Sequence, residues 1–474
     1  MKNNEFCLCG IIVAAAFILS ACSDDNPPQT NNTPPAGDNV TIPAPLPLDV
    51  PNGFTSDGKT FGMGPAFSGQ RPPKESLGTE TEYDGTLTIH SGQWRGAGDG
   101  SAGAGDIISF IESFRPDGED GFVIPDLGSQ KTLRISGATD EQKKAVENAL
   151  RLINAALPFD KRIKLGPPVT TFDRRGVPDN EIHIHFTEGK TGDWPVGEEG
   201  NGLGKAKVDA SHVVLSGYAL IDTDGVAEDN ADLQGIITRE LLRAYGIVVH
   251  AEDATFPDST LLLSSAHPVY LSLYGETLLA ITTLTPGTDV GDLSSVDLGN
   301  WNETAFHLLG ELDLGEDQTI AFGAGFRNGL GKPWAHGPVP ETTLADNADL
   351  TGTVTWLGYL LGFTNDGNTV TGEAEIEMNF TPDTPTGTAV FTGLETWGTT
   401  SHPGKDGDGT TWSGGDISYP IEIVKEGTFE GFKSTTQNAG DLSEVSGAFV
   451  GREHEGAVGT VERSDLSAGF GAER

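Results

Sequence analysis

The sequence predicts a multidomain protein in which an α+β domain is followed by an all-β antiparallel up-and-down barrel of about eight strands. Two observations lead to this prediction. Residues 83–295 mix helical periodicity with strand-like alternation. Residues 296–474 instead hold short alternating stretches separated by Gly, Asn and Asp, with no helical pattern between them. Closure into a barrel is favoured because it removes unpaired sheet edges.

Residues 1–21 are predicted to be a lipoprotein signal peptide. Lys2 supplies a positive charge, residues 11–19 form an apolar core that is too short to span a membrane, and residues 19–22 read LSAC, which matches the lipobox of bacterial lipoproteins. We expect cleavage before Cys22 and acylation of Cys22, which would anchor the chain in a lipid bilayer. The alternative is a plain secretory signal with a chance Cys. Ser23 favours the outer membrane, and the choice between a periplasmic and a cell-surface position stays open.

Composition narrows the possible partners. The chain has 29 Lys+Arg against 69 Asp+Glu, a formal net charge of −40, which argues against nucleic-acid binding. Its three Cys would be lost with the signal or acylated, so the mature chain is expected to have no disulfide and no thiolate metal site. Residues 22–82, rich in Pro, Asn, Thr, Gly and Asp, are predicted to form a disordered tether.

Three segments define the first half of the predicted α+β domain. Residues 139–157 form the clearest helix, since Thr139 and Gln142 fit a capping box and Pro158 stops it. Residues 181–186 (EIHIHF) alternate strictly and predict a half-buried strand. Residues 213–222 predict another strand just before the next helix.

That next helix lies within residues 234–250, QGIITRELLRAYGIVVH. Its apolar residues recur at helical spacing: Ile237, Leu241, Ala244 and Tyr245. Gly246 is well placed to end the helix. The pattern resembles the HExxHxxGxxH helix of metzincin zinc peptidases, with Glu240 and Gly246 in matching positions. Arg239 and Arg243 replace the two helix histidines, and His250 comes one residue late for the third.

The resemblance implies a catalytic zinc ion and a Glu acting as general base, but the arginines change the expectation. A guanidinium has no lone pair to give to a metal. We therefore expect residues 83–295 to be a degenerate metallopeptidase-like domain without a zinc cofactor, in which Glu240 is a remnant of the catalytic site. We hypothesise that Arg239 and Arg243 supply the missing positive charge and hold Glu240 or another carboxylate in a structural ion pair. The alternative is an ordinary amphipathic helix with a solvated RELLR face.

An active enzyme is the rival interpretation. A zinc metalloendopeptidase with an unorthodox ligand set would use Glu240 as base and draw its ligands from the histidines: His183, His185, His250 and His267. Among these, His250 is a weak metal candidate and lies nearest the expected place. Alternation alone accounts for His183 and His185. Residues 254–263 stand where the family places its Met turn but contain no Met, and residues 270–275 resemble the closing helix.

The second domain is predicted from eight candidate strands: 305–313, 319–326, 350–363, 369–380, 387–394, 417–425, 447–451 and 457–462. Its last segments read VSGAFVG (445–451), HEGAVGT (454–460) and AGFGAER (468–474). These segments resemble the end of the barrel of transferrin-binding protein B and related surface lipoproteins, and residues 352–356 and 371–376 fit its earlier strands. The glycines favour close strand approach or turns, so this signature predicts the fold and not the ligand.

Together these patterns predict an outer-membrane lipoprotein that binds an external protein or small-molecule ligand through the barrel and a non-catalytic peptidase-like domain. Transferrin is not expected, because the family has two barrel-bearing lobes and this chain has one predicted barrel. A third interpretation treats the barrel as a passenger needed for export.

Overall fold

The computed structural model describes part of the chain, in the following ranges: 53–55, 60–63, 72–94, 103–112, 123–190, 194–195, 201–224, 231–247, 273–315, 317–347, 350–381, 385–426, 429–434 and 443–474. Cys22, His250 and His267 lie outside these residues, as do the predicted signal peptide and the segment 254–263. Within the described ranges, no helix combines the length and the apolar character needed to cross a membrane.

A five-stranded sheet forms the first layer, with strand order β6-β5-β7-β9-β8. The strands are β5 (Thr132–Ser136), β6 (Lys164–Leu165), β7 (Glu181–Thr187), β8 (Gly202–Val208) and β9 (Val214–Asp222). Strands β6, β5, β7 and β9 are parallel, whereas β8 runs antiparallel to β9 at the edge. The predicted strands over 181–186 and 213–222 are therefore confirmed as β7 and β9.

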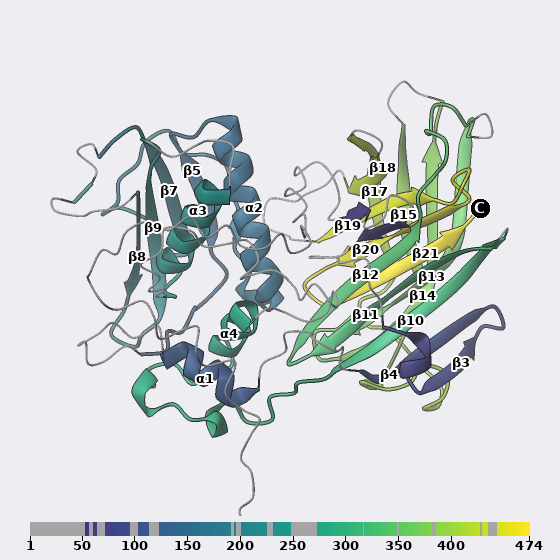
Figure 1. The fold of residues 1–474 in the computed structure, drawn as a ribbon, viewed down its shortest axis with the longest axis horizontal. Helices are drawn as coiled ribbons and strands as arrows, with labels where there is room; N and C mark the ends of the chain where they lie inside the picture. The colour runs from purple at the N-terminus through teal and green to yellow at the C-terminus, as the bar shows by residue number, and fades with distance from the viewer. Residues whose placement is uncertain are drawn as a thin grey trace, which may run out of the picture. The chain divides into compact units, whose positions relative to one another are not determined.

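Helices share one buried core with this sheet on one side of it (Figure 1). They are α1 (Ala104–Glu112), α2 (Asp140–Ala156), α3 (Ala231–Ala244) and α4 (Leu273–Ile281). Short 3-10 helices occur at Lys74–Ser76, Phe159–Lys161, Val290–Asp292 and Ser295–Leu298. Thr139 and Gln142 form the predicted capping box of α2. Side chains at i, i+4 and i+7 of α2, namely Val146, Leu150 and Ile153, share one buried core with Ile237 and Leu241 of α3. This core supplies the main stabilisation of the layer, because an amphipathic helix is held chiefly by its packed apolar face.

A seven-stranded antiparallel sheet is the second layer, in the order β1-β2-β12-β11-β10-β4-β3. Its strands are β1 (Gly53–Thr55), β2 (Thr60–Met63), β3 (Thr79–Tyr83), β4 (Leu87–Trp94), β10 (Ala305–Gly315), β11 (Gln318–Arg327) and β12 (Leu330–Pro338). Two predicted boundaries are therefore wrong. The predicted tether, 22–82, contributes three strands to this sheet, and the strands predicted at 305–313 and 319–326 belong to it and not to the barrel. The physical reason is that this sheet is assembled by two pairings between distant segments, β2 with β12 and β4 with β10, which local periodicity does not specify.

A closed eight-stranded antiparallel barrel is the third layer, and it confirms the predicted up-and-down barrel. It consists of β13 (Thr353–Thr364), β14 (Asn368–Asn379), β15 (Thr386–Thr399), β17 (Ile417–Glu426), β18 (Phe429–Ser434), β19 (Glu444–Val450), β20 (Gly456–Glu462) and β21 (Leu466–Glu473), with the short β16 (Thr410–Thr411) beside β15. Each strand pairs with the next along the chain, and β21 closes the barrel on β13.

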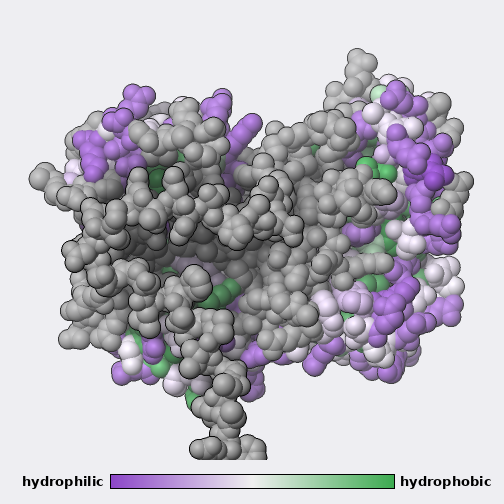
Figure 2. All heavy atoms as spheres, in the orientation of Figure 1, coloured by the Kyte–Doolittle hydropathy of each residue, from purple (hydrophilic) through white to green (hydrophobic). Residues whose placement is uncertain are grey.

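Alternation along the strands fills this barrel. In β14, Ala374, Ile376 and Met378 are buried in the barrel core, whereas Glu373 and Glu375 between them are exposed. Aromatic rings complete the core: Trp356, Phe391, Phe432, Phe449 and Phe470. On the surface shown in Figure 2, hydrophilic residues predominate among the described residues at the right of the view, with small hydrophobic patches between them.

Glycines in the predicted C-terminal signature allow the seven-stranded sheet to pack on the outside of the barrel. A Cβ at Gly469 would lie 2.3 Å from the Trp334 carbonyl oxygen of β12, and one at Gly471 would lie 2.3 Å from the Phe322 ring of β11. Both glycines lie in β21. The signature at 468–474 is therefore structural, as its composition predicted.

Candidate functional site

Glu240 lies on α3 where the helix faces the edge strand β8. Glycines make this close approach possible: a Cβ at Gly202 would lie 2.6 Å from the Glu240 side chain, and one at Gly204 would lie 2.2 Å from the Glu240 carbonyl oxygen. On β9, a Cβ at Gly217 would lie 1.9 Å from the carbonyl oxygen of Ala244. The end of α3 is therefore packed directly on the backbone of the sheet.

We expect Gly217→Ala to lower the free energy of unfolding by about 1–3 kcal/mol, since the helix end must move to admit the methyl group. Gly105 in α1 offers a matched control, because a Cβ there meets nothing within 4 Å. Gly105→Ala should leave stability unchanged or raise it by about 0.5–1 kcal/mol through helix propensity. Urea unfolding followed by circular dichroism measures both. Equal midpoints for Gly217→Ala and the parent chain would contradict the packing.

Two guanidinium groups hold the Glu240 carboxylate. Arg239 Nε donates to Glu240 Oε1 at 2.7 Å, and an Arg243 guanidinium nitrogen lies 3.2 Å from Oε1 and 3.3 Å from Oε2. The backbone N–H of Gly204 donates to Oε2 at 2.6 Å. The Glu240 side chain is 0% exposed. The structure thus places Glu240 in an ion pair with both arginines. The prediction of a solvated RELLR face is wrong, because the glycines bring β8 over it.

The end of α3 follows the sequence prediction. Gly246 has φ +91°, a conformation that favours glycine. The Ile247 N–H bonds to the Leu242 carbonyl at 2.9 Å, which is the six-to-one bond of a Schellman cap. The helix therefore ends at Ala244 and the chain turns away at Gly246. The path from there to His250 lies outside the described residues.

The structure gives the two β7 histidines separate partners. His183 Nε2 lies 2.7 Å from Glu181 Oε2, while His185 Nδ1 lies 2.9 Å from the Ser136 hydroxyl. The His185 ring stacks on Phe172 with a centroid distance of 4.7 Å. Within the described ranges, no group of three or more His, Cys, Asp or Glu side chains is arranged to hold a metal ion. The structure thus brings neither histidine to Glu240.

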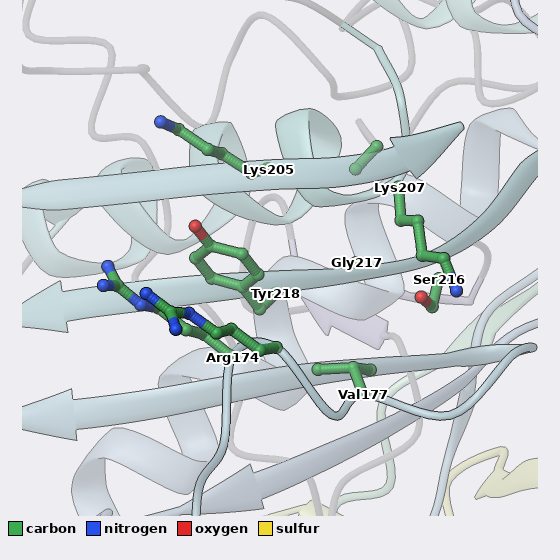
Figure 3. A pocket seen from close by; sticks show the side chains of 9 residues that line it. Arg174, Val177, Lys205, Lys207, Ser216, Gly217 and Tyr218 are labelled. Atoms are coloured by element: carbon green, nitrogen blue, oxygen red, sulfur yellow. The ribbon is translucent and has the colours of Figure 1, made fainter. Parts of the chain in front are cut away.

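A small cavity on the same sheet was not predicted from the sequence. It is lined by side chains from β8, β9 and the loop before β7, including Arg174, Arg175, Lys205, Lys207 and Tyr218 (Figure 3). The signal in the sequence is an Arg-Arg pair and a Lys-Ala-Lys stretch in a strongly acidic chain. These stretches are separated in sequence, so only the fold shows that they share one cavity.

A further charged cluster lies where β12 and β20 meet the segment after α2, within residues Pro45–Arg474. An Arg162 guanidinium nitrogen lies 2.7 Å from Glu462 Oε2. Lys332 is buried at 1% exposure and its ammonium donates to the Ala155 carbonyl oxygen. Burial, together with the Arg162 charge, lowers the pKa of Lys332 to about 7.

Comparison with protein-family models and with curated proteins finds no match. Among solved structures, transferrin binding protein B from serogroup B Neisseria meningitidis is similar, with 16% identity, a TM-score of 0.20 and coverage of 35% of each chain. Transferrin binding protein B from Haemophilus parasuis Hp5 is similar at 14% identity and a TM-score of 0.21, again with 35% of each chain covered. The N-lobe of lactoferrin binding protein B from Moraxella bovis is similar at 10% identity and a TM-score of 0.18, covering 37% of this chain and 80% of that one. The chain spans 35% of the length of the two transferrin binding proteins.

Proposed function

We propose that this protein is a lipid-anchored protein of the bacterial cell envelope that binds an external protein or small-molecule ligand without cleaving it. Cys22 would attach it to the outer membrane, as the lipobox predicts. The proposal that the ligand is not cleaved rests on the hydrogen bonding of Glu240. Both of its carboxylate oxygens accept hydrogen bonds from guanidinium groups, and one of them also accepts from Gly204.

This arrangement argues against peptidase chemistry at Glu240. A general base must take a proton from water or substrate, which needs an accessible carboxylate oxygen, and this side chain is 0% exposed. A catalytic zinc ion needs three protein ligands and an open position. The positions on α3 that would face such an ion carry Arg239 and Arg243, whose guanidinium groups repel a cation. We therefore propose that the site works without zinc.

We further propose that the α/β layer is a metzincin-like domain that has lost its metal. Three features support this proposal. A helix, strands and then a helix with the Glu-x5-Gly spacing of Glu240 and Gly246 follow one another along the chain. The strand beside that helix, β8, is the antiparallel edge strand, which is where metzincins bind substrate. The Gly204 N–H that bonds Glu240 belongs to this strand.

The barrel is the second part of the proposed binding protein. Its C-terminal motif at 468–474 resembles that of transferrin-binding protein B, and its exposed outer positions such as Glu373 and Glu375 offer a polar surface to a partner. The described residues contain one closed barrel.

Metal content and proteolysis test the proposal. We expect the mature chain to carry no stoichiometric zinc by elemental mass spectrometry after incubation with zinc, and to leave casein uncut with or without chelator. Stoichiometric zinc that Glu240→Gln retains and His250→Ala removes, with chelator-sensitive cleavage, would establish the rival zinc metalloendopeptidase. A fractionation readout tests the anchor separately: Cys22→Ser should release the protein from membranes, and retention there would contradict acylation at Cys22.

A further inference from the structure

Basic side chains gather on the face of the five-stranded sheet that is turned away from the helices. Successive strand residues point to opposite faces. Because Gly204 and Gly217 face α3, Lys205, Lys207 and Tyr218 point to the other side. There they line a cavity of about 70 Å³ together with Arg174 and Arg175. Figure 3 shows the Tyr218 ring between Lys205 on β8 and Arg174 on the loop.

This gathering is unusual for the composition of the chain. Lys and Arg number 29 against 69 Asp and Glu, yet among the described residues four basic side chains and no carboxylate line this cavity. Like charges at such close range repel one another. An arrangement of this kind is expected where a negatively charged group balances the charges.

The loop turn holds the two arginines side by side and leaves them available. Asp173 Oδ1 accepts the Arg175 backbone N–H at 2.9 Å, and the Asp173 carbonyl accepts the Gly176 N–H at 3.1 Å. The Asp173 carboxylate therefore stabilises the turn. Within the described ranges, no carboxylate lies at ion-pair distance from the Arg174 or the Arg175 guanidinium.

The lysines contribute charges that are exposed to solvent. Lys207 Nζ lies 3.3 Å from Asp179 Oδ1, but these side chains are 62% and 60% exposed. Solvent screens such a pair, so it competes little with a bound anion. Lys205 is exposed on the same strand, two residues before Lys207.

We propose that this cavity binds a tetrahedral oxyanion, a phosphate or sulfate group, either free or as part of a larger ligand. The planar guanidinium groups of Arg174 and Arg175 suit bidentate hydrogen bonding to two oxygens of one group. The lysine ammonium groups add point charges, and the Tyr218 hydroxyl is a neutral donor. The cavity volume suits one such group and falls short of the 300–1,000 Å³ typical of whole-ligand pockets. Because the site lies on the opposite face from Glu240, it goes beyond the function proposed above and does not depend on it.

Isothermal titration of the whole mature chain with sodium phosphate and sodium sulfate at low ionic strength tests this site. We expect saturable one-to-one binding of at least one of the two anions, weakening as sodium chloride is added because the contacts are ionic. Arg174→Gln combined with Arg175→Gln should weaken binding at least tenfold. Lys143→Gln with Lys144→Gln on α2 removes the same charge from neighbouring positions away from the cavity, and should leave the affinity within a factor of two.

Three outcomes would overturn the proposal: no saturable binding of either anion, equal weakening in both double variants, or acetate binding as tightly as phosphate. Lys205→Gln provides a second, milder variant on a different element. It should weaken binding severalfold while the circular dichroism spectrum stays that of the parent chain. Phosphate binding that strengthens from pH 6 to pH 8, with sulfate binding unchanged, would identify the phosphate dianion as the preferred form.

Discussion

Replacing both Arg239 and Arg243 with Ala is expected to lower the free energy of unfolding by about 3–5 kcal/mol. Glu240 is fully buried between α3 and β8, and the Gly204 N–H would be the one hydrogen bond left to it among those described above. A buried carboxylate without a counter-charge is destabilising, because its loss of hydration is no longer offset by electrostatic attraction. The loss should therefore greatly exceed that of an exposed ion pair.

Chemical unfolding monitored by circular dichroism measures this effect, and Lys143→Ala is the control. Lys143 pairs with Asp140 at 2.8 Å on the same type of element, but both side chains are solvent-accessible, so its removal should change stability far less than the double Arg replacement. Adding Glu240→Leu to the double Arg variant should recover part of the loss, because the uncompensated charge is gone. A double Arg variant as stable as the parent chain would show that the ion pair does not support the fold.

The contact of Glu240 with Arg243 could be predicted from helix spacing, whereas adjacent residues such as Arg239 and Glu240 do not face each other on a helix. Arg239 adjoins Glu240 in sequence, and Arg243 follows it by three residues, a separation that places side chains on the same helix face. The burial of the group could not be predicted in this way. It depends on Gly202 and Gly204 of β8 approaching α3, which is a property of tertiary packing.

The barrel and the seven-stranded sheet also differ in how much of their structure the local sequence predicts. Alternation predicted most barrel strands, because one face of each strand is buried in the barrel core and the other is not. The seven-stranded sheet joins β4 to β10 and β2 to β12, which are distant along the chain. Composition suggested a tether over 22–82, yet β2 there is a short strand paired with the distant β12, and β3 is paired with β4. Arg174 and Lys205 likewise meet in one cavity through the fold alone.

Between pH 6 and pH 9, the free energy of unfolding of the parent chain is expected to rise by about 2–3 kcal/mol more than that of Lys332→Met. The difference comes from the ionisation of Lys332. Burial and the positive charge of Arg162 lower the pKa of Lys332 to about 7. Glu462 opposes this effect, but it is already paired with Arg162 at 2.7 Å. Burial alone would raise the pKa of the Glu462 carboxyl, whereas the charges of Arg162 and Lys332 outweigh it and lower that pKa.

The sign of the effect follows from proton binding in the two states. Between about pH 7 and the ordinary lysine pKa near 10.4, the unfolded chain holds a proton on Lys332 that the folded chain has released, so raising the pH favours the folded state. Below about pH 7 both states are protonated, and the cost of the buried ammonium is present in full. Urea unfolding at pH 6, 7, 8 and 9 gives the slope of the free energy of unfolding against pH for the parent chain and for Lys332→Met. Lys144→Met on the exposed side of α2 serves as the control and should keep the slope of the parent chain, because its ammonium is solvated in both states. Parallel pH profiles for the parent chain and Lys332→Met would mean that Lys332 is solvated in the folded protein and that the contact between β12 and the end of α2 is open to water.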